Sequence, residues 1–299
     1  MKYFTGTAGW SYQDWDGIVY PEKKPSRFHG LNYLARFFNF IEINSTFYRP
    51  PVFRFAQSWA NRVSEREFFL FAVKLHQDFT HNREKTSSRL ADEFKFGIEP
   101  LRSSSRLGAI LMQFPWSFRY SASSLDHLVS LFRFFSGYPL ALEIRHTSWS
   151  RPEFYELLRE NGVSFCNIDQ PLFRDSLPPE EKVTHKEFSY VRLHGRNYKN
   201  WFKKDAGRDQ RYDYLYSEAE LDEWAGKIKF LSGKAEKVFI VTNNHYQGQA
   251  VVNALQIKNK LTGEIFELPP RLLERFPVLQ SIAEPSEPDQ KDLFPKNSG

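Results

Sequence analysis

The sequence has 299 residues, of which 41% are hydrophobic and 26% charged, a composition typical of a globular protein and unlike that of a disordered chain. A net charge of +5 favours anionic partners only mildly. The single cysteine, Cys166, excludes an internal disulfide and a cysteine-rich metal site, and its place within an apolar strand predicts a small core residue.

Eight short apolar runs recur along the chain, and each has the length of a β-strand. They cover residues 3–9, 40–44, 68–74, 108–113, 140–146, 164–169, 189–195 and 237–244. The first run follows the N-terminus directly and leaves no room for a signal peptide, and no apolar run is long enough to cross a bilayer. We therefore expect a cytoplasmic protein with no membrane partner.

Helical segments alternate with these runs. We expect helices over 31–38, 53–63, 89–102, 125–135, 247–260 and 269–279, one between residues 150 and 162, and one that starts at 217. Ser150 and Pro152 predict a helix start, Asn161 and Gly162 its end, and Ser217 with Glu220 a capping box. The proline-rich connection after the sixth run departs from this regularity, and we expect it to be only briefly helical.

The alternation predicts an α/β fold, an irregular TIM-type (β/α) barrel that forms a single domain over residues 1–281. Residues 282–299 are rich in acidic residues and proline and predict a flexible, disordered C-terminal tail.

The polar residues of the strands predict where a site lies. Ile41 and Ile43 alternate with Glu42 and Asn44, so in a barrel the isoleucines face the helices and the polar pair faces inward near the carboxyl end of the strand. The same alternation predicts inward positions for Glu143 with Arg145, for Arg192 with His194, and for Asn167 with Asp169 opposite Cys166 and Ile168.

These residues suggest two halves of one site. Glu42 and Glu143, supported by His194 and Asp169, are the candidate catalytic residues, because two facing carboxylates can perform acid/base chemistry. The candidate substrate-binding residues are polar, cationic or aromatic and lie at strand ends: Asn44, Tyr48, Lys74, Gln113, Arg145, Arg192, Asn243, Trp10 and Trp149. Lys74, Arg145 and Arg192 suit a phosphate or carboxylate.

Two alternatives stand beside this interpretation. Glu143–Arg145 and Glu42–Arg192 can be buried ion pairs that only satisfy one another. Glu42, Glu143, Asp169 and His194 are also plausible ligands for a divalent metal, although no tight spacing motif supports them and three cations crowd the same end. We therefore expect no cofactor.

Several motifs resemble those of the YecE-like family, domain of unknown function 72, over roughly residues 3–258. They are the run 6–12, Glu42–Arg49, Val73-Lys74, Gln113–Pro115, Glu143–Arg145 with Ser148-Trp149, Arg192–Gly195, Asn243-Asn244 and Gly248–Ala250. The resemblance implies an irregular TIM-type barrel and names no reaction.

Three functions fit these observations. The first is an enzyme that uses acid/base chemistry on a phosphate-bearing, nucleic-acid-related substrate, of hydrolase or lyase type. The second is a glycoside or sugar-acid enzyme with the same carboxylate pair. The third is a non-catalytic module that binds an anion, DNA or RNA.

The tail adds a partner hypothesis. Gln290-Lys-Asp-Leu-Phe294 resembles the pentapeptide by which bacterial DNA-repair and replication proteins bind the sliding clamp, with Gln290, Asp292, Leu293 and Phe294 as the binding residues. Lys291 stands where leucine is common.

Overall fold

The computed structural model describes residues 2–201 and 208–284, which form a nearly closed barrel of eight parallel strands. The strands are β1 (Tyr3–Thr7), β2 (Phe40–Ile43), β3 (Leu70–Lys74), β4 (Leu107–Gln113), β5 (Leu140–Glu143), β6 (Val163–Asp169), β7 (Phe188–Leu193) and β8 (Lys237–Thr242). Hydrogen-bonded neighbours run in the order β1-β8-β7-β6-β5-β4-β3-β2. The predicted TIM-like fold and its eight strands are confirmed.

The barrel closes at the seam between β1 and β2, where few ladder bonds form. Ala8 pairs with Glu42 through an isolated bridge, and the Gly9 amide donates to the Glu42 carbonyl at 2.8 Å. Below it, the Asn39 side chain accepts from the Thr5 amide at 2.8 Å and donates to the Tyr3 carbonyl at 3.0 Å. A side-chain amide thus replaces the missing ladder bonds and satisfies backbone groups that would otherwise be costly to bury.

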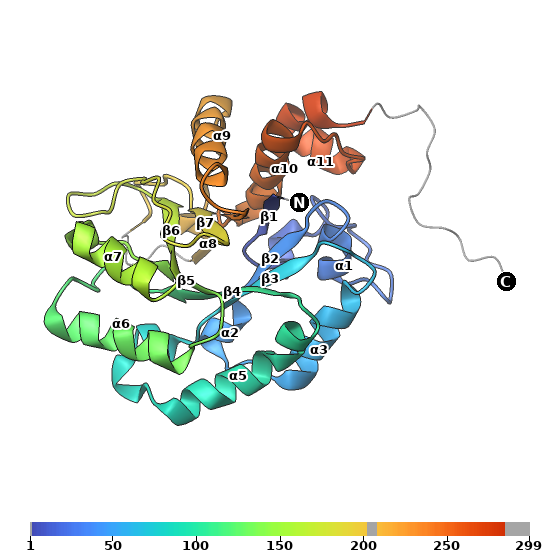
Figure 1. Ribbon diagram of the computed structural model, residues 1–299. Coiled ribbons are helices and arrows are strands. Elements are labelled where there is room, and N and C mark those ends of the chain that lie inside the picture. Colours follow the sequence, from blue (N-terminus) through green and yellow to red (C-terminus); the bar gives the residue numbers. More distant parts are fainter. Residues whose placement is uncertain (1, 202–207, 285–299) are drawn as a thin grey trace.

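Helices surround the barrel (Figure 1), and α5, α6 and α7 run along its lower left in that view. The α-helices are α1 (Gly30–Leu34), α2 (Ser45–Tyr48), α3 (Phe53–Arg62), α4 (Gln77–Thr80), α5 (Ser88–Ser103), α6 (Ala122–Phe134), α7 (Pro152–Glu160), α8 (Arg208–Arg211), α9 (Glu218–Ser232), α10 (Gln249–Thr262) and α11 (Pro270–Arg275). None of the helices within the described ranges is long and apolar enough to cross a bilayer.

The predicted helix starts lie within three residues of the observed ones, but the expected cap of α7 is wrong. The capping box at Ser217 and Glu220 is confirmed. Ser150 was expected to cap α7, but Arg151 occupies that position and the Ser150 hydroxyl donates to Glu180 instead, at 2.8 Å. Segment 170–187 between β6 and β7 contains no helix, so the brief helix expected there is wrong; its prolines disfavour helical structure.

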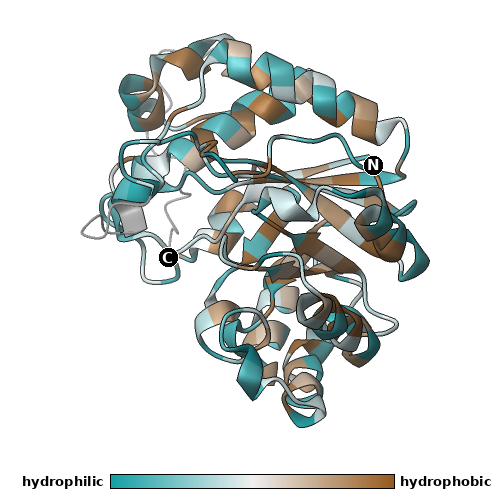
Figure 2. Cartoon of the chain, turned by 90° about the vertical axis from the view of Figure 1, so that its left-hand side faces the viewer, coloured by the Kyte–Doolittle hydropathy of each residue, from teal (hydrophilic) through white to brown (hydrophobic). Residues whose placement is uncertain are grey.

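The apolar core has an inner part and an outer part. Inside the barrel, aromatic rings fill the amino-terminal end of the strands, where Phe40 stacks on Phe239 with ring centroids 4.6 Å apart. Outside, apolar residues on the second face of the strands pack against the helices. Figure 2 shows that the most hydrophobic residues gather on the strands between the surrounding helices. Because aromatic rings fill the amino-terminal end of the barrel interior, the carboxyl ends of the strands are the place for a site.

The packed chain continues beyond Ser281, because Ala283 pairs with Phe266 and the Glu284 amide donates to the Phe266 carbonyl. The clamp-like motif at 290–294 lies outside the described residues.

Gly6 allows the close approach of β1 to β2, since a Cβ there would lie 1.7 Å from the Phe40 carbonyl oxygen. We expect Gly6→Ala to lower the free energy of unfolding by about 3 kcal/mol or more, because backbone must move to relieve the clash. Gly226→Ala is the control, since a Cβ there meets nothing within 4 Å on helix α9; it should raise stability by roughly 0.5–1 kcal/mol. Urea unfolding followed by circular dichroism measures both, and similar values for the two variants would contradict this account.

Candidate functional site

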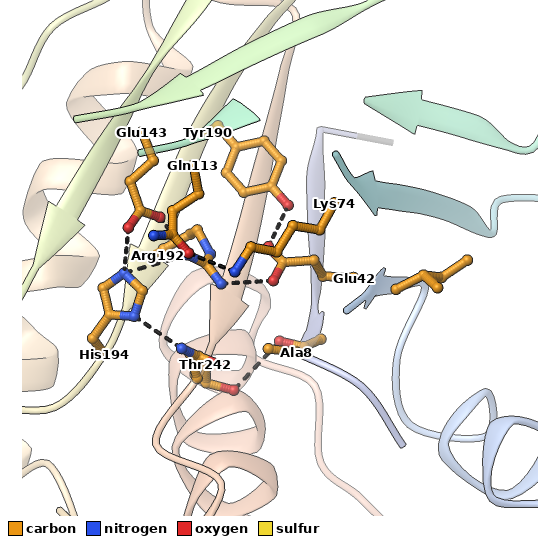
Figure 3. A network of polar contacts seen from close by, with 12 residues as sticks. Ala8, Glu42, Lys74, Gln113, Glu143, Tyr190, Arg192, His194 and Thr242 are labelled. Carbon is orange, nitrogen blue, oxygen red and sulfur yellow. Dashed lines mark hydrogen bonds and ion pairs between the residues drawn. The ribbon is translucent and has the colours of Figure 1, made fainter. Parts of the chain in front are cut away.

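Arg192 lies at the centre of a buried polar network inside the barrel (Figure 3). Its side chain comes from β7 and is only 1% exposed. Nη2 donates to Glu42 Oε1 at 2.7 Å, and Nη1 donates to Glu143 Oε2. One guanidinium therefore joins β2 to β5 across the interior. Such a charge is tolerable in a protein interior only when it is paired and hydrogen-bonded, as here.

Glu42 is fully buried and accepts a second bond. The Tyr190 hydroxyl donates to Glu42 Oε2 at 2.9 Å. Burial raises the pKa of Tyr190 well above its usual value, and the neighbouring Glu42 raises it further, so the phenol stays protonated as a donor. Tyr190 was not among the predicted site residues, although its position two residues before Arg192 on β7 places it on the same inward face.

Glu143 is held by three cationic or hydrogen-bonding neighbours. Oε1 accepts from Arg145 Nε at 2.8 Å and lies 3.2 Å from His194 Nε2. Burial raises the pKa of Glu143, but Arg192, His194 and Arg145 outweigh it and hold that pKa well below its usual value. Glu143 is therefore an anion that anchors two arginines.

His194 is buried and neutral. Burial lowers its pKa to about 3, and Arg192 and Arg145 act in the same direction against Glu143. The Asn243 amide nitrogen lies 2.9 Å from Nδ1; when it donates there, Nε2 carries the proton that faces Glu143. A base with so low a pKa is poorly matched to proton transfer near neutrality. Asn243 and His194 thus support Glu143 from one side.

The predicted acid/base pair of Glu42 and Glu143 has a different arrangement from the one expected. The sequence suggested a gap between them for a water or a scissile bond. The Arg192 guanidinium occupies that space and binds both carboxylates. The alternative of mutually satisfied ion pairs describes this geometry, with Arg192 shared by both acids.

Lys74 stands at the end of β3 and is partly exposed. Nζ donates to Gln113 Oε1 at 2.5 Å and lies 4.1 Å from the centre of the Phe47 ring. Burial of the amine lowers the pKa of Lys74 to about 7; Arg192 and Arg145 lower it as well, against Glu42 and Glu143. Within the described residues Lys74 forms no ion pair with a carboxylate, because both interior acids are bound to arginines.

Helix α2 positions the Phe47 ring against Lys74. The Thr46 hydroxyl contacts the Lys74 carbonyl at 2.6 Å and the Ile43 carbonyl at 3.1 Å, and so ties the start of α2 to the ends of β2 and β3. The His81 ring packs edge-on against Phe47, with ring centroids 4.9 Å apart. Phe47 and His81 were not among the predicted site residues, and no pattern in the sequence separates them from ordinary packing residues.

Arg145 forms the outer part of the network. Its side chain is 12% exposed and lies over the Trp201 ring, 5.6 Å from its centre. Trp201 also packs edge-on against His194 at 6.2 Å. Among the three cations of this network, Lys74 and Arg145 are therefore partly exposed, whereas Arg192 is buried.

Asp169 does not join this network, and the inward position predicted for it is wrong. Cys166 and Ile168 face the barrel interior, so Asn167 and Asp169 face outward. The reason lies in the segment that covers β6, which has no helix. Its exposed backbone groups need partners, and Asn167 exchanges two hydrogen bonds with the backbone of Lys182, at 3.0 and 2.8 Å.

On this outer side Asp169 forms a second network. Both of its oxygens accept from Arg196 Nε, at 3.0 and 2.9 Å, and Arg196 Nη1 donates to Glu220 Oε1 at 3.1 Å. Burial raises the pKa of Asp169, although Arg196 opposes this. Asp169 anchors the start of the loop after β7.

Other predicted substrate-binding residues lie apart from the network. Trp149 is fully buried in the outer core, where its indole donates to the Phe118 carbonyl at 2.8 Å, so the expected substrate contact is wrong. Trp10 packs against Trp59 at 5.8 Å. Tyr48 is 57% exposed on α2, and Asn44 precedes that helix without capping it.

The four proposed metal ligands do not converge. Asp169 faces the opposite side of the sheet from Glu42 and Glu143, and Arg192 lies between those two. No group of three His, Cys, Asp or Glu side chains within the described ranges is arranged to hold a metal ion.

Comparison with known proteins gives one consistent family. The profile of the family described as "Protein of unknown function DUF72" matches residues 4–274. The UPF0759 protein YunF of Bacillus subtilis (strain 168) is 30% identical over 286 residues, which cover 91% of this chain and 99% of that protein.

Solved structures of DUF72 family proteins are also similar. One from Thermotoga maritima is 36% identical, with a TM-score of 0.76, and the match covers 87% of this chain and 99% of that one. One from Enterococcus faecalis V583 is 25% identical, with a TM-score of 0.77, covering 90% and 98%.

The first prediction from this site concerns Arg192. Arg192→Met leaves two buried carboxylates without a counter-ion and should lower the free energy of unfolding by about 3–5 kcal/mol. Adding Glu42→Gln should recover part of this loss, with a coupling of at least about 1 kcal/mol in the double-mutant cycle. Arg159→Met is the control, because Arg159 pairs with Glu156 on the surface; it should cost less than about 1 kcal/mol. Additive losses for Arg192 and Glu42 in urea unfolding would contradict a shared network.

The second prediction concerns His194 and pH. The unfolded state gains a proton near 6.5 whereas folded His194 gains one only near 3, so between these values stability falls as pH falls. Relative to His194→Gln, the unmodified protein should lose up to about 1.4 kcal/mol per pH unit, or roughly 2 kcal/mol from pH 6.5 to 5. His185→Gln, at a half-exposed position, should change the slope less. Urea titrations at steps of half a pH unit measure the free energy of unfolding of each protein. If it depends on pH in the same way for the unmodified protein and His194→Gln, His194 is not buried in its neutral form.

Proposed function

The chain belongs to the DUF72 family, and we propose that its barrel is an enzyme for a phosphate-bearing, nucleic-acid-related substrate, with Lys74 as the proton-transfer group. The observation that carries the proposal is the position of Lys74. Among the described residues of the network it is the cation without a carboxylate partner. Its charge is therefore available to a ligand.

The charges of the network support an anionic substrate. Arg192 and Arg145 balance Glu42 and Glu143, and His194 is neutral. The protonated form of Lys74 then gives the site one positive charge. Arg145 is near enough to lower the pKa of Lys74 and is partly exposed, and its Nη1 can bind a phosphate oxygen while Nε and Nη2 stay with Glu143.

Lys74 is also suited to acid/base chemistry. A group with a pKa near the working pH is present in both protonation states and transfers protons most effectively. The pKa of about 7 for Lys74 meets this condition, whereas His194 at about 3 does not. In this proposal Glu42 and Glu143 are positioning residues that hold the arginines, which revises the catalytic role expected from the sequence.

The two competing functions fit less well. A glycoside or sugar-acid enzyme needs two carboxylates free to act on either side of a bond, and both acids here bind Arg192. A non-catalytic anion- or DNA-binding module would use the same cations but give no product.

Sulfate is the probe for the anion site, because it does not titrate near neutrality. We expect sulfate to bind the protonated form of Lys74, so its affinity should fall about tenfold per pH unit above 7 and level off below. Isothermal titration calorimetry in two buffers of different ionisation enthalpy should show proton uptake. Lys74→Met should bind weakly and without this pH dependence.

Lys85→Met is the matched control, since Lys85 is 60% exposed and lies on the surface; it should bind sulfate like the unmodified protein. Turnover is then tested on nucleotides, sugar phosphates and oligonucleotides, and should be lost in Lys74→Met. The absence of sulfate binding at pH 6, or binding unchanged by Lys74→Met, would overturn the proposal. Binding without any product would favour the non-catalytic module.

A further inference from the structure

We propose that the Lys74 amine is a nucleophile that forms an imine with an aldehyde that also carries a phosphate group. This inference rests on the proposed anion site and names the chemistry of its substrate. The starting point is that Lys74 combines partial exposure with contacts that leave its amine uncommitted to an acid.

The contacts of Nζ fit an amine that reacts. Gln113 Oε1 accepts one N–H and orients the group, and a neutral amide does not compensate an ammonium charge as a carboxylate would. The Phe47 ring also contacts the amine, with Nζ 4.1 Å from the ring centre. Thr46 fixes both parts, because it binds the Lys74 backbone and precedes Phe47. An amine held in this way loses little freedom on reaching a bound carbonyl.

The neighbouring charges favour the neutral amine before the substrate binds. Burial and the two nearby arginines lower the pKa of Lys74 to about 7, so roughly half of the amines are unprotonated at neutral pH. A lysine that is desolvated or lies beside another cation is the usual arrangement for imine formation with a carbonyl.

The step balances without an oxidant or reductant. The Nζ lone pair attacks the carbonyl carbon, the C=O π pair moves to oxygen, and one amine proton moves to that oxygen to give a carbinolamine. The remaining amine proton and the hydroxyl group then leave together as water, and a C=N bond forms. One proton from solvent then gives the iminium ion. Arg145 lies on the solvent side and is the residue that would hold the phosphate of the same molecule.

The test is reductive trapping. The full-length protein is incubated at pH 7 with glycolaldehyde phosphate and sodium cyanoborohydride, which reduces an iminium ion to a stable secondary amine. Peptide mass mapping should find the adduct on Lys74 at least about tenfold faster than on any other lysine, because ordinary lysines are almost wholly protonated at this pH. Glycolaldehyde without phosphate should label Lys74 at least tenfold more slowly, and sulfate should slow labelling by glycolaldehyde phosphate.

Lys74→Arg keeps a cation but cannot form an imine, so it should still bind sulfate and give no adduct above the surface background. Lys85→Met should label at Lys74 as the unmodified protein does. An oligonucleotide with an abasic site offers the same aldehyde and phosphate groups from DNA. Faster trapping of this oligonucleotide than of glycolaldehyde phosphate would identify DNA as the source of the substrate. Slower trapping would identify a free sugar phosphate.

Labelling spread over surface lysines without enrichment at Lys74 would overturn the inference, and so would equal rates with and without phosphate. Sulfate binding that depends on Lys74 but no adduct would reject the imine and leave the proposed function intact. If the unmodified protein does not bind sulfate, both the imine and the proposed function are rejected.

Discussion

The buried guanidinium of Arg192 is the interaction on which the rest of the site depends. A charge in this interior carries a large desolvation penalty unless it is paired on more than one side. Glu42 and Glu143 supply the pairs from β2 and β5, and each is completed by a further donor, Tyr190 or Arg145. The network joins strands that are distant around the barrel. It therefore fixes the positions of the strand ends as well as the charges.

The same pairing determines which group is chemically available. Once both interior carboxylates are bound to arginines, Lys74 has an amide and an aromatic ring as neighbours. An amine in these surroundings favours the neutral form more than a surface lysine does. The reactivity that we propose for Lys74 therefore depends on the pairing of Glu42 and Glu143 with arginines. In this proposal Glu42 and Glu143, which the sequence suggests as catalysts, contribute by holding the arginines.

Much of the fold could be predicted from the sequence, because eight apolar runs alternate with amphipathic helices and each strand has a period of two. The same period correctly placed Glu42, Glu143, Arg192 and His194 inside the barrel. It failed at β6, where the rule that polar residues face inward assumes an apolar helix outside. Asn167 instead binds the backbone of a covering segment without a helix. Which carboxylate pairs with which arginine also depends on distances across the barrel, which local pattern does not contain.

The outward position of Asp169 on β6 creates a link between the two faces of the barrel wall. His194, on the inner face after β7, supports Glu143, while Arg196, two residues later, is bound by Asp169 on the outer side. The Tyr216 hydroxyl accepts from the Gly195 amide between them, at 2.8 Å. The chain is therefore held on both sides as it leaves the strand and leads to Trp201, whose ring covers Arg145. Asp169 is thus connected to the inner network through the backbone it anchors, since the direction of this segment determines how Trp201 meets the arginine.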